Sequence, residues 1–491
     1  MDKEIVHDSH STPKAKRKKT RLIMLAVCGL AAVVAVLLII NWQTIWGPAE
    51  ISIKEKTYST GLTELDLTEV AELTNADIEP LKYMTNLKVL KVGDYYTNCQ
   101  ISDISVLGNL TQLQWLSFDS AQISDISILS QLTKLETLHL WNNQITDISA
   151  LSNLKGLSRL SLGTNQITDV SALSDLTGLQ WLALDCNQIN DIGALGNLTK
   201  LEWLDLFENK ISDISALGGL TDLTWLALDY NQINNIGVLK NLTKLESLHL
   251  SKNQINDISV LGRLTGLTGL NLSGTQIGDI SALSGLTNLT ELNLYNSEIR
   301  NINALSGLTG LTSLYLGANQ IRDISALSGL TSLTDLSLYS NQISDISALS
   351  GLTNLADLSL WGNQISDISA LSGLTSLIRL ELDSNQISDI SALRGLSSLT
   401  DLSSHSNQIS DISALSSLTS LVRLDLYSNQ ISDISALSDL TSLTSLYLGI
   451  NQISDISVLS RLPNLTNLHL NSTRIKDWSP VNHVANVIGR P

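Results

Sequence analysis

From Leu113 onward the sequence repeats every 22 residues without a slip, and this period limits what the chain can fold into. The unit that begins at Leu333, LTDLSLYSNQISDISALSGLTN, shows the shared pattern: leucine or isoleucine at seven positions, asparagine at the ninth and aspartate at the thirteenth. A unit this short cannot bury its apolar residues alone, so neighbouring units must stack and share a core. The sequence therefore predicts one elongated solenoid in place of several globular domains.

The repeat divides the chain into regions. Seventeen regular units fill residues 113–484 and close with a capping half-turn, while two irregular units at 62–112 keep the leucine spacing around insertions. Residues 485–491 form a short C-terminal tail. Residues 41–61 are expected to be a linker that leads into an N-terminal cap.

Each unit carries signals for two short elements. The Leu-x-Leu segment alternates with a period of two, which is typical of a strand. The later Ile, Leu and Leu lie three residues apart, which suits a tight turn or a 3₁₀ segment. All seven apolar positions are expected to point inward.

Asparagine at the ninth position forms a ladder along the array, and its amide can bond backbone groups of adjacent turns. We interpret this ladder as structural. It is interrupted at Cys99, Ala121, Thr275, Ser297 and Thr473. One core leucine is also replaced, by Ser404, whose hydroxyl needs a buried partner or costs stability.

Aspartate at the thirteenth position, for example Asp345, forms a second ladder with two interpretations. A row of carboxylates could bind calcium. However, each aspartate directly precedes the turn, usually Ile-Ser-x-Leu, and a short acceptor there caps free N–H groups. Capping is the stronger interpretation, and calcium binding stays open.

The chain has three cysteines, of which Cys99 and Cys186 lie in the repeats. They are about four units apart, which at ~4.8 Å per stacked strand places them about 19 Å from each other. A disulfide needs Cα atoms within about 7 Å. No bridge between them is expected.

The first 40 residues differ from the repeats. Residues 1–21 form a basic tail, and residues 22–40 (LIMLAVCGLAAVVAVLLII) contain no charge. A helix of that length, at about 1.5 Å per residue, spans a bilayer, and the basic side is expected to stay in the cytoplasm. We therefore expect a signal anchor in the cell membrane, a single pass with extracellular repeats; a cleavable signal peptide is the alternative.

The charge of the chain is unevenly placed. Of its 30 basic and 47 acidic residues, seven and three respectively lie in residues 1–21, which leaves the rest with a net charge of −21. Such a surface repels phosphate backbones. We expect no nucleic-acid partner.

The pattern resembles the leucine-rich repeat, and in particular the 22-residue repeats of bacterial internalins, which share NQIxDIxxLxxLTxL. The resemblance covers about residues 62–484. It implies a curved α/β-type repeat solenoid with a parallel β-sheet on the concave face and short 3₁₀ or turn segments on the convex face. It also implies that the concave face binds a protein. The chain lacks a Leu-Pro-x-Thr-Gly signal and an immunoglobulin-like domain after the repeats, so a role in host-cell invasion is not carried over.

In such a solenoid the third, fifth and seventh residues of each unit face the concave side. Six of the nine tryptophans lie in these columns, most densely in residues 113–244. Tryptophan and tyrosine dominate binding hot spots because a rigid ring buries much area at low entropic cost. The candidate ligand-binding residues are Trp115, Asp119, Trp141, Trp181, Asp185, Trp203, Asp205, Phe207, Trp225, Asp229, Tyr295, Tyr315, Tyr339 and Trp361. The alternative is that flat strand faces simply favour aromatics for cross-strand packing.

The sequence carries no sign of catalysis. A Gly-x-Ser-x-Gly elbow, a phosphate-binding loop and zinc spacing are all missing, and near-identical turns offer no deep pocket. The concave histidines, among them His139 and His249, lie several units apart and cannot share a metal. We expect no enzymatic activity, cofactor or metal. Residues 93–98 (GDYYTN) form an insertion that either contacts a ligand or is a cap irregularity.

Three functions remain. The first is capture of a protein ligand on the concave face. The second is binding of a cell-wall or surface glycan by the same face, since tryptophan and tyrosine beside aspartate also suit sugar rings. The third is a passive surface spacer, for which the concave tryptophans would be dispensable. We favour the protein ligand.

Overall fold

The computed structural model describes residues 31–36, 47–93 and 99–490. The expected cytoplasmic tail and most of the expected anchor at 22–40 lie outside the described residues; within that anchor, residues 31–36 are helical. In the described part of the chain, no helix is long and apolar enough to cross a membrane. Tyr95 and Tyr96 of the insertion also lie outside the described residues.

The repeats form one long parallel sheet, in which each strand pairs with the strand of the next unit in register. Its twenty strands are β3 (Glu64–Asp66), β4 (Val89–Val92), β5 (Trp115–Phe118), β6 (Thr137–His139), β7 (Arg159–Ser161), β8 (Trp181–Ala183), β9 (Trp203–Asp205), β10 (Trp225–Ala227), β11 (Ser247–His249), β12 (Gly269–Asn271), β13 (Glu291–Asn293), β14 (Ser313–Tyr315), β15 (Asp335–Ser337), β16 (Asp357–Ser359), β17 (Arg379–Glu381), β18 (Asp401–Ser403), β19 (Arg423–Asp425), β20 (Ser445–Tyr447), β21 (Asn467–His469) and β22 (Asn486–Ile488).

A 3₁₀ helix follows each strand of this sheet except β22, on the opposite side of the core. These helices are η1 (Glu79–Tyr83), η2 (Ser105–Asn109), η3 (Ser127–Gln131), η4 (Ser149–Leu151), η5 (Ser171–Leu173), η6 (Gly193–Asn197), η7 (Ser215–Gly219), η8 (Gly237–Asn241), η9 (Ser259–Arg263), η10 (Ser281–Gly285), η11 (Asn303–Leu305), η12 (Ser325–Leu327), η13 (Ser347–Leu349), η14 (Ser369–Gly373), η15 (Ser391–Gly395), η16 (Ser413–Ser417), η17 (Ser435–Leu437), η18 (Ser457–Arg461) and η19 (Ser479–Val481).

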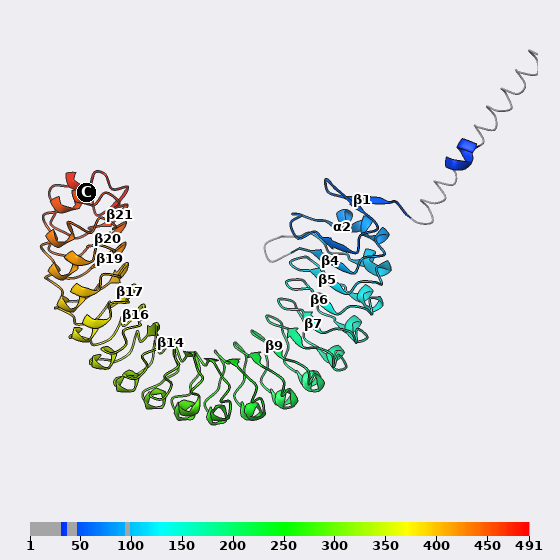
Figure 1. Cartoon of the computed structure of the whole chain (residues 1–491), viewed down its shortest axis with the longest axis horizontal. Coiled ribbons are helices and arrows are strands. Elements are labelled where there is room, and N and C mark those ends of the chain that lie inside the picture. Colours follow the sequence, from blue (N-terminus) through cyan, green and yellow to red (C-terminus); the bar gives the residue numbers. More distant parts are fainter. Residues whose placement is uncertain (1–30, 37–46, 94–98, 491) are drawn as a thin grey trace, which may run out of the picture.

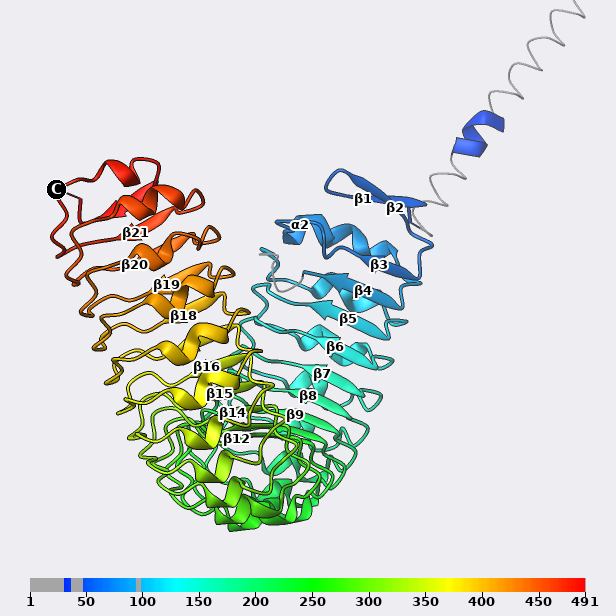
Figure 2. The same ribbon diagram turned by 60° about the vertical axis from the view of Figure 1, so that its left-hand side comes forward.

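Figure 1 shows the resulting arc, with strands along its inner side and 3₁₀ helices along its outer side. The two ends of the array, near β4 and β21, lie apart in both views (Figures 1 and 2). The predicted fold class is confirmed: the chain is a curved repeat solenoid with a parallel concave sheet and convex 3₁₀ turns.

The N-terminal end of the array carries its own small elements. The antiparallel hairpin of β1 (Glu50–Ile53) and β2 (Lys56–Ser59) lies beside η1, and a short helix, α2 (Asn75–Ile78), precedes η1. Ile51 and Ile53 are buried while their neighbours on β1 are exposed. The hairpin therefore adds its apolar face to the end of the shared core.

The seven apolar positions of each unit build the core. In the unit that begins at Leu333 all seven are at most 2% exposed: Leu333, Leu336, Leu338, Ile343, Ile346, Leu349 and Leu352. Each unit covers the apolar face of the next, so the core is one continuous column.

The asparagine ladder bonds adjacent units, as predicted. The Asn363 side-chain amide donates to the backbone oxygens of Leu338 and Leu360 at 3.0 Å each, and its oxygen accepts from the Ile343 N–H at 3.1 Å. Where the ladder is interrupted, Thr275 donates to the Leu272 oxygen at 2.5 Å. One amide thus ties its own turn to the preceding unit.

The aspartate ladder caps the turns. Asp345 accepts a 2.8 Å hydrogen bond from the N–H of Ser347, the first residue of η13, and this bond lowers the pKa of the carboxyl. The same bond recurs in most units and confirms the capping interpretation. Among the described residues, no group of three or more His, Cys, Asp or Glu side chains is arranged to hold a metal ion.

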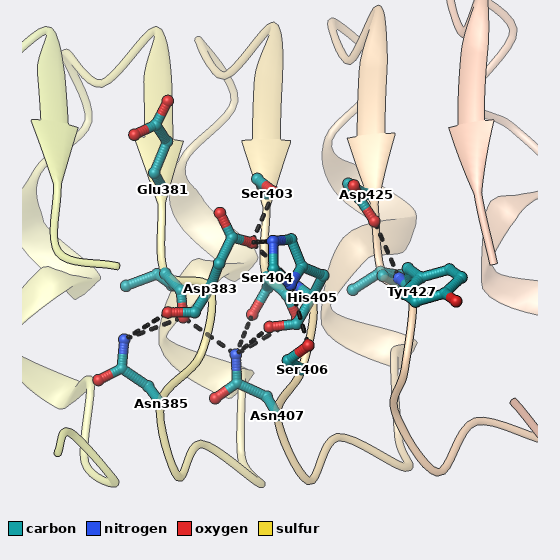
Figure 3. Close-up of polar contacts among 12 residues, drawn as sticks. Glu381, Asp383, Asn385, Ser403, Ser404, His405, Ser406, Asn407, Asp425 and Tyr427 are labelled. Atoms are coloured by element: carbon teal, nitrogen blue, oxygen red, sulfur yellow. Dashed lines mark hydrogen bonds and ion pairs between the residues drawn. The ribbon is translucent and has the colours of Figure 1, made fainter. Parts of the chain in front are cut away.

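Ser404 occupies a core position that is leucine in most units, and it is 1% exposed. Its hydroxyl accepts a long hydrogen bond, 3.4 Å, from the Asn407 amide, and its backbone oxygen also accepts from this amide (Figure 3). The backbone oxygen accepts a further bond from the Asn429 amide. The hydroxyl thus has a half-buried partner at the outer limit of bonding distance.

Candidate functional site

A row of stacked rings runs along the N-terminal half of the concave sheet. The aromatic row consists of Trp115, His139, Trp181, Trp203, Trp225 and His249. The centres of Trp181 and Trp203 are 4.4 Å apart and those of Trp203 and Trp225 4.3 Å apart, with ring planes within 10° of parallel. The three tryptophans stack because β8, β9 and β10 pair in register, so identical columns lie one strand spacing apart.

Stacking changes what these tryptophans offer to a ligand. From the sequence, the concave tryptophans are either exposed for a ligand or packed across strands. In the structure they are both. Trp203 is covered on both faces by its neighbours, yet it is half-buried and not fully buried, so its accessible part is the ring edge. The stack of Trp181, Trp203 and Trp225 therefore presents a line of indole edges, because the ring faces already contact one another.

An acidic strip lies beside the aromatic row and consists of Asp185, Asp205 and Asp229. Asp205 accepts one hydrogen bond, from the Phe207 N–H at 2.9 Å. Burial raises the pKa of Asp205 to about 7, with the negative charges of Asp185 and Asp229 adding to the shift. Asp229, by contrast, accepts from both the N–H and the hydroxyl of Ser251, at 2.8 and 2.6 Å.

The Asp185 carboxylate is contacted by a side chain that comes from two units earlier, that of Trp141. Burial raises its pKa, and a hydrogen bond from the Trp141 side chain partly offsets this effect. Gly163 occupies the intervening unit, where a Cβ would collide with the Asp185 carboxylate. A glycine in the seventh column thus lets side chains two units apart meet; Gly317 does the same for Tyr295 and Tyr339, whose ring centres are 5.7 Å apart.

The predicted site residues do not form one site. Trp141, Trp181, Asp185, Trp203, Asp205, Phe207, Trp225 and Asp229 gather on neighbouring units, with Trp115 and Asp119 at the N-terminal end of the same stretch. Tyr295, Tyr339 and Trp361 form a second cluster further along, in which Trp361 stacks on Tyr339 at 4.8 Å. Tyr315 instead donates to Asp335 at 3.0 Å.

In the C-terminal third of the concave face, Asp383 and Asp401 are paired internally, whereas burial raises the pKa of Asp425. Asp383 accepts from the Ser403 hydroxyl at 2.6 Å and from the His405 N–H at 2.7 Å (Figure 3). Arg423 pairs with Asp401 at 2.8 Å. This region therefore leaves less unbalanced charge for a ligand than the acidic strip does.

Sequence reasoning missed some members of the site. The sequence indicates His139 and His249 only as possible metal ligands, but they flank the stack of Trp181, Trp203 and Trp225 at its two ends, and His139 connects that stack to Trp115. Tyr230 lies at the eighth position of its unit, just outside the three concave columns, and is 50% exposed. The centre of its ring is 5.4 Å from the centre of the Phe207 ring. The available signal was the alignment of aromatic residues in adjacent units, including the eighth position.

Fold and site together define a solenoid with one long parallel sheet along its inner side. The family model described as Leucine Rich repeats (2 copies) matches residues 111–153, 133–175, 265–309, 309–351, 353–398, 397–439 and 441–483, and two further leucine-rich repeat models match residues 179–233 and 241–261. The first model alone matches more than half of the chain. The chain therefore belongs to the leucine-rich repeat family.

Solved structures with this fold come from both bacteria and plants. The internalin InlF of Listeria monocytogenes is 35% identical, with 70% of this chain and 89% of that chain covered and a TM-score of 0.47. The functional domain of InlJ from the same organism is 23% identical, with 74% and 75% covered and a TM-score of 0.57. The ectodomain of the Arabidopsis receptor kinase HAESA, in complex with an IDA peptide hormone, is 22% identical, with 89% and 86% covered and a TM-score of 0.59. No curated protein matches the chain.

Proposed function

We propose that this chain is a non-enzymatic binding protein that captures a protein ligand on the N-terminal half of its concave face. The observation that carries the proposal is the aromatic row beside the acidic strip. It concentrates half-buried rings and desolvated carboxylates on adjacent strands, in the composition of a binding hot spot. The peptide-bound HAESA ectodomain shares the fold, which makes a peptide or protein the first class of partner to test.

Ring geometry favours a protein over a glycan at the aromatic row. A sugar ring stacks on the flat face of an aromatic ring, and the faces of Trp203 are occupied by Trp181 and Trp225. The glycan alternative is best served by Trp361, which is 37% exposed and has Tyr339 stacked on it. A protein ligand is therefore expected to depend on Trp203 and its two neighbours in the stack, and a glycan on Trp361.

Replacement of Trp181, Trp203 and Trp225 by alanine is expected to weaken ligand binding at least tenfold. Truncating a hot-spot ring commonly lowers the binding free energy by about 2 kcal/mol or more. The full chain in mild detergent is used as bait against surface-protein extract and against purified wall glycan. The matched control replaces Tyr339 and Trp361 by alanine. Circular dichroism checks that each variant stays folded.

The outcomes separate the three functions. Loss of a captured protein in the triple variant alone supports the proposal. Retention on glycan that depends on Trp361 would move the function to glycan binding. A surface spacer would show the same behaviour for the parent chain and both variants.

We further propose that residues 22–40 anchor the chain in the cell membrane, with the repeats outside. The support is the uncharged 19-residue run, the basic tail before it and the acidic remainder after it. The protein is then expected to stay in the membrane pellet after alkaline carbonate extraction and to be degraded by protease added to intact cells. Release into the carbonate supernatant would contradict a spanning anchor.

A further inference from the structure

The middle of the acidic strip is shaped differently from the rest of the sheet. In the fifth column Asp205 pairs in register with Ala183 on one side and Ala227 on the other. Both alanines are buried and their methyl groups carry no hydrogen-bond donor, so the half-buried Asp205 carboxylate has no side-chain partner on either flank. The third-column residues Trp181, Trp203 and Trp225 lie on one side of the fifth column, and the seventh-column residues lie on the other.

The charge of this carboxylate is unbalanced. Among the described residues, no salt bridge includes Asp185 or Asp205. Burial disfavours both ionised carboxylates, and the charges of Asp185 and Asp229 add to this effect at Asp205, so the pKa of Asp185 and that of Asp205 are both raised. A cation at Asp205 would offset these penalties by Coulomb attraction, whereas an anion or an apolar group would not.

The kind of cation follows from the surroundings. The described carboxylates form no cluster suited to a metal ion, and the line of indole edges is suited to an aliphatic chain. Lysine and arginine combine an apolar stem with a charged end. The chain itself shows this combination in the same row, where the Lys91 ammonium lies 5.8 Å from the centre of the Trp115 ring.

We infer that the Asp205 carboxylate pairs with a lysine or arginine side chain of an extended protein segment, with the stem of that side chain along the tryptophan edges and its charge on Asp205. This inference rests on the proposed protein-binding function and names the chemistry of the partner. From Trp115 to His249 the row crosses seven strands, or about 29 Å at ~4.8 Å per strand, which an extended segment of about nine residues would cover. The net charge of −21 outside the basic tail attracts such a partner.

A peptide selection tests the inference. A random dodecapeptide library displayed on phage is panned against the full chain in mild detergent, and the enriched sequences are compared with the unselected library. Enrichment of lysine or arginine is expected. The tightest peptide is then synthesised in two forms, one with its key lysine or arginine and one with norleucine there.

A double-mutant cycle locates the contact. Norleucine is expected to weaken binding about tenfold or more to the parent chain and less than about twofold to Asp205→Asn, which keeps the size of the side chain. The matched control is Asp425→Asn. Asp425 holds the same position ten units further on and accepts the same hydrogen bond, from the Tyr427 N–H at 2.9 Å, but it has no tryptophan ladder beside it. This control should retain the full effect of norleucine.

Each outcome decides something. Enriched peptides that need Trp203 but show no basic residue, or that bind Asp205→Asn unchanged, would overturn this inference and leave the proposed function standing. An effect of norleucine that disappears equally in Asp425→Asn would also overturn it, since the charge would then act over the whole face. Failure to enrich any peptide, or enrichment unaffected by Trp203→Ala, would count against both proposals.

Discussion

Replacing Asn363 with alanine is expected to lower the free energy of unfolding around its unit by about 3–5 kcal/mol, as expected for breaking a buried hydrogen-bond network. The Asn363 side-chain NH₂ donates to the backbone oxygens of Leu338, Leu360 and, more distantly, Trp361, and its oxygen accepts from the Ile343 N–H. Alanine would leave these buried backbone groups unpaired, and each such group costs about 1–3 kcal/mol. The side chain itself is 8% exposed, so water cannot readily replace it.

Amide hydrogen exchange measures this effect locally, which matters because a long repeat array does not unfold in one step. The Ile343 amide should lose most of its protection, together with its neighbours in the same two units. Asn354→Ala is the matched control: Asn354 is exposed and makes one hydrogen bond, to Thr331 at 2.9 Å. Equal losses of protection in the two variants would contradict a structural role for the ladder.

The fold could be predicted from the sequence because each of its interactions recurs at the repeat period. The apolar positions, the asparagine ladder and the aspartate caps each depend on one residue type at one fixed position, so a single unit such as Leu333 to Asn354 contains all of them. Stacking then requires no long-range information beyond the period itself. Asp345 and Asn341 illustrate this: the bonds that they make are those that their positions predict.

The candidate site was less predictable because its interactions depend on how neighbouring units differ. The columns place Trp203 on the concave face, but they do not show that its faces are covered by the rings on both sides. The seventh column likewise gives no sign that Gly163 lets Trp141 reach Asp185. Such contacts depend on side-chain direction, which a register alone does not determine.

The pairing of charges on the concave face is equally difficult to predict from the sequence. Asp205 and Asp383 are both acidic residues in the concave columns of the sequence. In the structure Asp383 accepts hydrogen bonds from Ser403 and His405, whereas Asp205 lies between two alanines with one backbone donor. Sequence position identified the surface, and only the neighbours across the strands separate a satisfied carboxylate from an unsatisfied one.

Asp205→Asn is expected to stabilise the fold at pH 8 by up to about 4 kcal/mol, because a pKa raised from 3.8 to about 7 corresponds to roughly three units at ~1.4 kcal/mol each. Asparagine keeps the oxygen that accepts from the Phe207 N–H and carries no charge. For the parent chain, the stability that the protonated carboxyl provides is complete below pH 3.8 and is lost as the pH rises through 7. The gain from the substitution should therefore be large at pH 8 and much smaller at pH 5.

The comparison is made by amide hydrogen exchange in the units around Asp205, with the full chain in mild detergent and the rates corrected for intrinsic exchange at each pH between 5 and 8. Within this window the capping carboxyls such as Asp345 stay ionised, since their pKa is lowered. His139, whose pKa burial lowers, titrates with the opposite sign in both proteins, so the difference between them isolates Asp205. Stability curves that stay parallel from pH 5 to 8 would contradict a desolvated carboxylate at this position. A variant that is more stable and yet loses its preference for basic peptides would show that the carboxylate costs stability and contributes binding, which a purely structural aspartate cannot do.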